Sequence, residues 1–213
     1  MCFSAPVSFT AAAFLAVAGV ATLKNVTDKK EYVLAAFPLI FATQQFVEGL
    51  TWLFLSGHLE GDPPYALGYI FFIYADVMWP LLVPIGVYLI EPQGIRKKLM
   101  VPLVFAGFAC AAYLLYMITA GTISSSIYES HIRYRIRGID FIPHIDLIYL
   151  FVVSASFLIT SHRIVMLFGI LLVSSFIATN YYMREVYVSV WCFFAAILSL
   201  ILCWHFYQHR NKT

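Results

Sequence analysis

The chain has 213 residues, of which 62% are hydrophobic and only 11% are charged, and its formal net charge is +2. Soluble domains carry about 45–50% apolar and about 25% charged residues, so the polar side chains here are too few to cover a soluble fold. The small net charge excludes the basic surface that is typical of nucleic-acid-binding proteins. The composition therefore predicts one domain, residues 1–213, whose main partner is the lipid bilayer.

Seven apolar runs have lengths near the roughly 20 residues that a helix needs to cross a hydrocarbon core about 30 Å thick. They predict an all-α bundle of seven transmembrane helices. Asp28 and Glu31 stand three residues apart before the second run, as in an N-terminal capping box. The run at 164–179 is short, so six helices is the competing count. The runs cover residues 5–23, 32–55, 65–90, 99–120, 143–160, 164–179 and 186–207.

A polar segment at 121–142 interrupts the pattern between the fourth and fifth runs. From Tyr128 to Arg137 charged side chains occupy every second position, with few exceptions, and a period of two is typical of strands. We expect a short β-like or irregular segment that covers the bundle as a lid. Its basic edge, Arg133, Arg135 and Arg137, is either a solvated strand face or a site for lipid phosphate or an anionic substrate.

The distribution of basic residues predicts the orientation. Of the 13 Lys and Arg residues, nine flank the ends that seven spans would place on one side of the membrane, and four flank the other ends. Basic residues are enriched in cytoplasmic loops, so the first side is predicted to be cytoplasmic. The N-terminus and the lid then lie outside, and the C-terminus lies in the cytoplasm.

Several segments resemble a family of bacterial multi-pass membrane proteins, a domain of unknown function whose members begin Met-Cys-Phe-Ser-Ala. The resemblance is carried by the opening MCFSAPVSF and by QQFVEGLTW, WPLLVPIGVYLIEP, DFIPH, SHR and VWCFFAAILS. It covers nearly the whole chain. It implies a membrane bundle in a bacterial inner membrane, and it implies no reaction, cofactor or substrate.

An acidic residue inside the second run is the first candidate for function. Glu48 lies about 10 Å below the outer end of that helix, at about 1.5 Å per residue. A charged carboxylate is costly in lipid, so Glu48 is expected to face the bundle interior. Gln44, Gln45 and Trp52 lie near it at helical spacing and form a polar stripe. The alternative role is a hydrogen-bonded clamp between helices.

The third run has a second acid, near the middle of the span and close to two prolines. Asp76 precedes Trp79 by three residues and Pro80 by four. Prolines free backbone carbonyls one turn earlier, and transporters line ion or substrate sites with such interrupted helices. The alternative is a kink whose polar groups are satisfied locally. Trp191 lies in the seventh run at a position loosely similar to that of Trp79 and joins the predicted pocket.

Two sets of residues are candidates for binding zinc or copper. The outer set is Cys2, His144 and Cys192, with Glu48 nearby, and it supplies a thiolate, an imidazole and a carboxylate. The inner set is His162 with the His205–His209 pair, whose spacing puts both rings on one helix face. Cysteine is also an ordinary packing residue, and the histidines also suit a polar cap at the membrane interface.

Three functions remain open at this stage. The first is an outward-opening pocket that binds or transports a small molecule, an ion or a lipid. The second is an intramembrane enzyme that uses metal or thiol chemistry. The third is a structural or partner subunit whose buried polar groups only align helices. The oligomeric state is open in all three.

Overall fold

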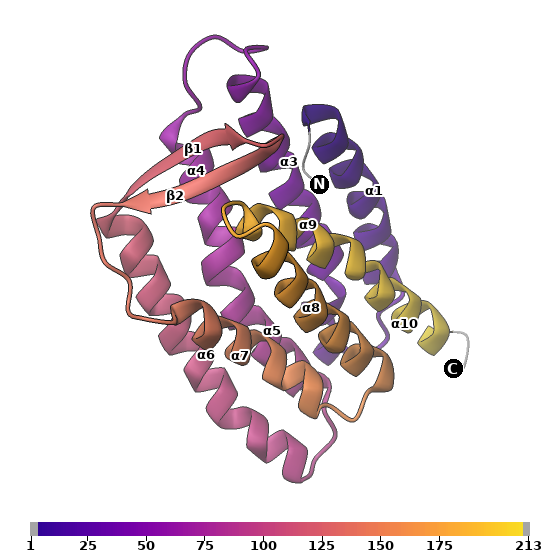
Figure 1. The fold of residues 1–213 in the computed structure, drawn as a ribbon. Helices are drawn as coiled ribbons and strands as arrows, with labels where there is room; N and C mark the ends of the chain where they lie inside the picture. Colours follow the sequence, from indigo (N-terminus) through magenta and orange to yellow (C-terminus); the bar gives the residue numbers. More distant parts are fainter. Residues whose placement is uncertain (1–3, 211–213) are drawn as a thin grey trace.

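The computed structural model describes the backbone of residues 4–210 and the side chains of residues 4–207. Figure 1 shows a bundle of roughly parallel and antiparallel helices with a two-stranded sheet across one end. The α-helices are α1 (Ala5–Lys24), α2 (Tyr32–Ala35), α3 (Phe37–Leu55), α4 (Tyr65–Phe72), α5 (Trp79–Ile90), α6 (Ile95–Ala120), α7 (Ile145–Ile159), α8 (Arg163–Tyr182), α9 (Tyr187–Leu198) and α10 (Leu200–Arg210). A 3₁₀ turn, Lys29–Glu31, precedes α2, and a π-helix, Ile73–Met78, joins α4 to α5.

These elements form the predicted helical bundle, because α2 continues into α3, α4 into α5 and α9 into α10 without a loop. Six of the resulting helices in the described chain are long and apolar enough to cross a membrane, which fits an integral membrane protein. The seventh, α7, has only 15 residues.

The short helix is not the one that the sequence indicated. The run at 164–179 extends to Tyr182, since Asn180 and two tyrosines continue the last turn of α8. The run at 143–160 loses its start because His144 adopts a left-handed backbone conformation (φ 60°) and delays α7 to Ile145. Helix α6 begins at Ile95 rather than residue 99, so its first turn is basic.

The π-helix has a local cause in the sequence. Pro80 has no N–H and cannot donate to the carbonyl of Asp76, four residues earlier, so one α-helical hydrogen bond is missing at this point. The residues Ile73–Met78 instead form a π-helix, a wider helix in which each hydrogen bond spans one more residue than in an α-helix. The Tyr149 hydroxyl of α7 donates to the carbonyl oxygen of Ala75 at 2.6 Å and so satisfies a backbone acceptor within the wide turn. The structure thus has a widened helix where the sequence indicated a broken or kinked one.

The lid is an antiparallel hairpin of β1 (Thr122–Tyr128) and β2 (His131–Arg137). Glu129 and Ser130 form its two-residue turn, and both have positive φ angles, as in type I′ turns. One face packs down on the bundle: Ile132 is fully buried, and the Tyr134 ring stacks on Phe71 of α4 with centroids 3.9 Å apart. The expected β-like segment between the fourth and fifth runs is confirmed.

The opposite end of the bundle is held by Glu91, which follows α5 and is only 3% exposed. Its carboxylate accepts hydrogen bonds from the Thr160 hydroxyl at 2.7 Å and from the Ser161 backbone N–H at 3.0 Å. Arg96 donates to the carbonyl oxygen of Thr160 at 3.1 Å. These bonds connect the α5–α6 link to the α7–α8 link.

Candidate ligand-binding site

Glu48 lies in the bundle interior, as expected, and is fully buried. The Gln45 amide donates to its carboxylate at 3.3 Å, and the Ser189 hydroxyl of α9 donates to its other oxygen. Gln44 is also fully buried and lies against the Cys192 thiol. The polar stripe of α3 therefore faces α9 and forms a hydrogen-bonded connection between two helices.

Two of the three tryptophans of the predicted pocket, Trp52 and Trp79, pack in the core. Trp79 is 5% exposed, and its ring stacks on Phe41 at a centroid distance of 4.0 Å. Trp52 is 4% exposed in an apolar cluster with Phe71 and Ala5. Neither side chain lines the cavity described next.

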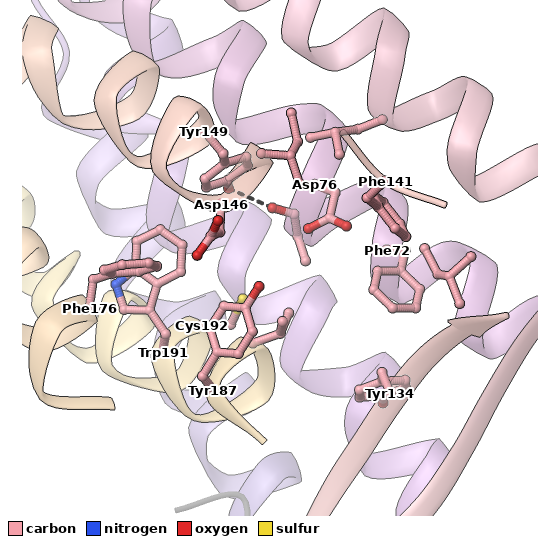
Figure 2. Close-up of a pocket in the computed structure, with 15 residues that line it drawn as sticks. Phe72, Asp76, Tyr134, Phe141, Asp146, Tyr149, Phe176, Tyr187, Trp191 and Cys192 are labelled. Carbon is pink, nitrogen blue, oxygen red and sulfur yellow. Dashed lines mark hydrogen bonds between the residues drawn. The ribbon is translucent and has the colours of Figure 1, made fainter. Parts of the chain in front are cut away.

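A cavity of about 230 Å³ lies beneath the hairpin, between the π-helix, α6, α7, α8 and α9. Figure 2 shows its walls. Two acids, Asp76 and Asp146, point into it, and among the described residues none of its lining side chains is basic. Most of the remaining wall is aromatic, namely Phe72, Tyr134, Phe141, Tyr149, Phe176, Tyr187 and Trp191.

The acids reach the cavity from different elements. Asp76 belongs to the π-helix, and Asp146 lies in the first turn of α7. Between Ser4 and Tyr207, neither carboxylate has a hydrogen-bond or ion-pair partner, whereas Glu48 and Glu91 are both held by donors. Asp76 lies in the wide turn that precedes Pro80, and the Tyr149–Ala75 hydrogen bond connects that turn to α7.

The aromatic wall is held firmly by its own contacts. The indole N–H of Trp191 donates to the carbonyl oxygen of Leu172 at 3.2 Å. Its ring meets Phe176 and Tyr149 edge-to-face, with centroid distances of 5.1 Å and 5.8 Å. A ligand would therefore meet a largely preformed wall.

The predicted pocket is thus divided into two parts. Asp76 and Trp191 line the cavity, while Glu48, Gln44 and Gln45 lie behind its α9 wall. Cys192 lines the cavity, and Ser189, one turn earlier, reaches back to Glu48. Helix α9 therefore separates the cavity from the buried polar cluster and touches both.

The proposed outer metal set is only partly described. Cys2 lies outside the described residues. His144 is exposed at the start of α7, and Cys192 is 4% exposed inside the bundle. Among the residues that the structure describes, no group of three or more His, Cys, Asp and Glu side chains is placed to hold a metal ion. Zinc or copper binding that involves Cys2 stays a prediction.

The inner set lies at the opposite end of the bundle. The rings of His162 and His205 are 6.0 Å apart and nearly perpendicular, and they border a polar cavity of about 170 Å³ together with Glu91. The carboxylate of Glu91 is already engaged by Thr160 and Ser161. The side chain of His209 lies outside the described residues, so metal binding there also stays a prediction.

The sequence analysis did not assign Asp146, Tyr149 or Tyr187 to the pocket. A signal was present, since Asp146 and Tyr149 are three residues apart and Tyr187 and Trp191 are four apart. Residues at these spacings share a helix face. Both pairs lie in the first turns of apolar helices, and both helices begin on the same side of the membrane. This arrangement would have predicted a shared cavity.

Comparison with known proteins matches residues 1–213 to one family model, described as a family of unknown function (DUF6629). No curated protein and no solved structure matches the chain.

Proposed function

Because the chain belongs to the DUF6629 family, whose function is unknown, we propose an activity from its geometry: it is a multi-pass membrane protein that binds a small cation in the cavity beneath the hairpin. The cavity, rather than the Glu48 cluster, is the binding site. Binding is the first step of either sensing or transport.

One observation carries the proposal, namely two carboxylates that share a cavity without a basic residue among the described lining. Acids within membrane spans are rare, and they usually face a partner or a ligand pathway. Asp76 and Asp146 have no protein partner between Ser4 and Tyr207. A cation that enters the cavity supplies that partner. An anion would meet two like charges, and a neutral ligand would leave both acids uncompensated.

The distribution of charge supports an outward-facing site. The hairpin end of the bundle carries few basic residues, and two of them, Arg133 and Arg135, are paired with Glu185 at 3.6 Å and 2.7 Å. The opposite end carries the basic first turn of α6 and the Lys29–Lys30 pair. By the positive-inside rule the hairpin end faces outward, so the ligand arrives from outside the cell.

The proposal is tested by thermal unfolding of the purified protein in detergent, with a panel of chloride salts of inorganic and organic cations and sodium salts of matched anions. A ligand that binds only the folded state raises the melting temperature with its concentration. We expect stabilisation by at least one cation and by none of the anions. Asp76→Asn and Asp146→Asn should abolish it.

Asp140→Asn is the matched control, because Asp140 is an exposed acid six residues before Asp146 and does not line the cavity. This variant should keep the full shift. Stabilisation that survives both cavity substitutions would reject the site, and a panel without any cation effect would reject the function.

A further inference from the structure

We infer that the cation is an organic ammonium ion with an apolar body, whose charge lies between Asp76 and Asp146 and whose body packs against Tyr187 and Trp191. This inference rests on the proposed function and names the chemical class of its ligand. Three properties of the cavity distinguish such an ion from a metal ion.

The first property is the shortage of oxygen ligands. Calcium takes about six to eight oxygens, and magnesium needs a nearly ideal octahedron. The described lining offers the carboxylates of Asp76 and Asp146 and the hydroxyls of Tyr149 and Tyr187, with no Asn, Gln, Ser or Thr. One of the hydroxyls, that of Tyr149, is already donated to the carbonyl of Ala75. No described cluster of ligating side chains is placed to hold a metal ion.

The second property is the aromatic wall. The face of an aromatic ring attracts ammonium groups through its quadrupole, and the attraction grows when the site is shielded from water. Trp191 and Phe176 are locked edge-to-face, and Tyr187 also meets Phe176 edge-to-face at 6.2 Å. Figure 2 shows Tyr187, Trp191 and the two acids around one common space. Aromatic rings make favourable apolar contacts with the alkyl or aryl body of an amine, whereas a hydrated metal ion gains little binding energy from them.

The third property is size. A volume of about 230 Å³ equals that of roughly seven or eight liquid waters at about 30 Å³ each. A bare metal ion would leave most of this space to water against an aromatic surface. An amine of the size of butylamine or phenethylamine places carbon against that surface and its charge at the acids.

The experiment uses matched probes on the full-length protein in detergent. The amines are tetramethylammonium, butylammonium and phenethylammonium chloride. The neutral counterpart is 2-phenylethanol, and the inorganic ions are sodium, magnesium and calcium. Calorimetric titration measures affinity, and thermal unfolding confirms that each variant is folded.

At least one amine should bind, and 2-phenylethanol should bind much more weakly. Asp76→Asn should weaken amine binding about thirtyfold or more, as expected when one partner of a buried charge pair is removed. Tyr187→Leu and Trp191→Leu should each weaken it about two- to thirtyfold. Tyr187→Phe keeps the ring and should keep most of the affinity. Trp204→Leu is the control, since Trp204 is 57% exposed on α10 and does not line the cavity.

The outcomes separate the inference from the proposed function. Inorganic cations that bind in an Asp76-dependent manner, without any amine, would overturn the inference and leave the proposed function standing. Equal binding of phenethylammonium and 2-phenylethanol would overturn both, because the charge would not be recognised. Failure of every probe to bind would also overturn both.

Discussion

Replacing Glu91 removes the acceptor that connects two links at the end of the bundle opposite the hairpin. Its carboxylate receives the Thr160 hydroxyl at 2.7 Å and the Ser161 N–H at 3.0 Å and 3.1 Å. Its backbone carbonyl also accepts from Lys97 at 2.8 Å, and that bond does not depend on the side chain. The substitutions Glu91→Gln and Glu91→Ala therefore test the carboxylate alone.

The magnitude follows from the number of bonds that are lost. A hydrogen bond to a charged group is worth about 1.5–3 kcal/mol. Glu91→Ala removes the charged acceptor of two hydrogen bonds, one from the buried Thr160 hydroxyl and one from the Ser161 N–H, and should lower the free energy of unfolding by about 3–6 kcal/mol. Glu91→Gln keeps one carbonyl oxygen and turns an amide N–H₂ toward the donors, so it should cost about 1.5–3 kcal/mol. Glu60→Gln, in the exposed α3–α4 loop, is the control and should cost almost nothing.

The effect should depend on pH with a definite sign. Burial alone would raise the pKa of Glu91, but hydrogen bonds from Thr160 and Ser161, with help from His162, hold that pKa below its ordinary value of 4.5. A lowered folded-state pKa gives stabilisation that is present above the unfolded value and is lost as the pH falls through the folded value. The difference between wild type and Glu91→Gln should therefore be present above about pH 4.5 and shrink below it.

The assay is equilibrium unfolding in mixed micelles, followed by far-ultraviolet circular dichroism at each pH. Wild type, Glu91→Gln, Glu91→Ala and Glu60→Gln are measured side by side. A wild-type advantage that is absent at pH 7, or one of equal size at pH 7 and pH 3.5, would refute the assignment of Glu91 as a charged acceptor.

Further predictions concern other contacts. A methyl group on Gly19 would lie 2.7 Å from the backbone nitrogen of Leu39, so Gly19→Ala should separate α1 from α3 and cost about 1–3 kcal/mol in the same assay. Ser189→Ala removes the donor to Glu48 and should cost about 0.6–1.7 kcal/mol, the range for hydrogen bonds between membrane helices; an unchanged unfolding free energy would contradict that bond. Glu185→Gln breaks exposed ion pairs worth about 0.2–1 kcal/mol, so it should leave global stability nearly unchanged while amide exchange in β2 becomes faster.

Local patterns in the sequence predicted much of the fold. Apolar runs located every helix of the bundle, because lipid requires an apolar surface over a fixed thickness. The spacing of Asp28 and Glu31 predicted a capping box. The structure confirms it, with the Lys30 N–H donating to Asp28 at 3.0 Å. Alternation from Tyr128 to Arg137 predicted the strand that became β2.

Helix ends were harder to predict, because hydropathy reports lipid exposure rather than backbone conformation. Hydropathy excludes the basic residues Arg96, Lys97 and Lys98 from the apolar run. Arg and Lys nevertheless have high helix propensity, so these residues extend α6 beyond that run. His144 follows a proline and is polar, and only its left-handed backbone shows that α7 begins after it. The backbone conformation of these residues follows from local preferences that hydropathy does not measure.

The binding site was predicted only in part, because a cavity is formed by elements far apart in the chain. The sequence singled out Glu48 first and Asp76 second, since both are acids within apolar helices. Only the packing shows that Glu48 accepts a hydrogen bond from a hydroxyl of α9, whereas Asp76 lines the cavity. That difference depends on how each helix is rotated about its own axis. A helix that is apolar on several faces does not reveal this rotation in its sequence.

The position of Asp76 shows how one residue type leads to a site. Pro80 removes a backbone donor, the helix widens over Ile73–Met78, and the extra residue per turn rotates Asp76 relative to the core-facing Trp79. If this reasoning is right, Pro80→Ala should restore a regular helix. It should reduce amine binding as strongly as Asp76→Asn, although Pro80 has no charge and does not line the cavity. A Pro80→Ala variant with wild-type binding would show that the wide turn is not what directs Asp76 to the ligand.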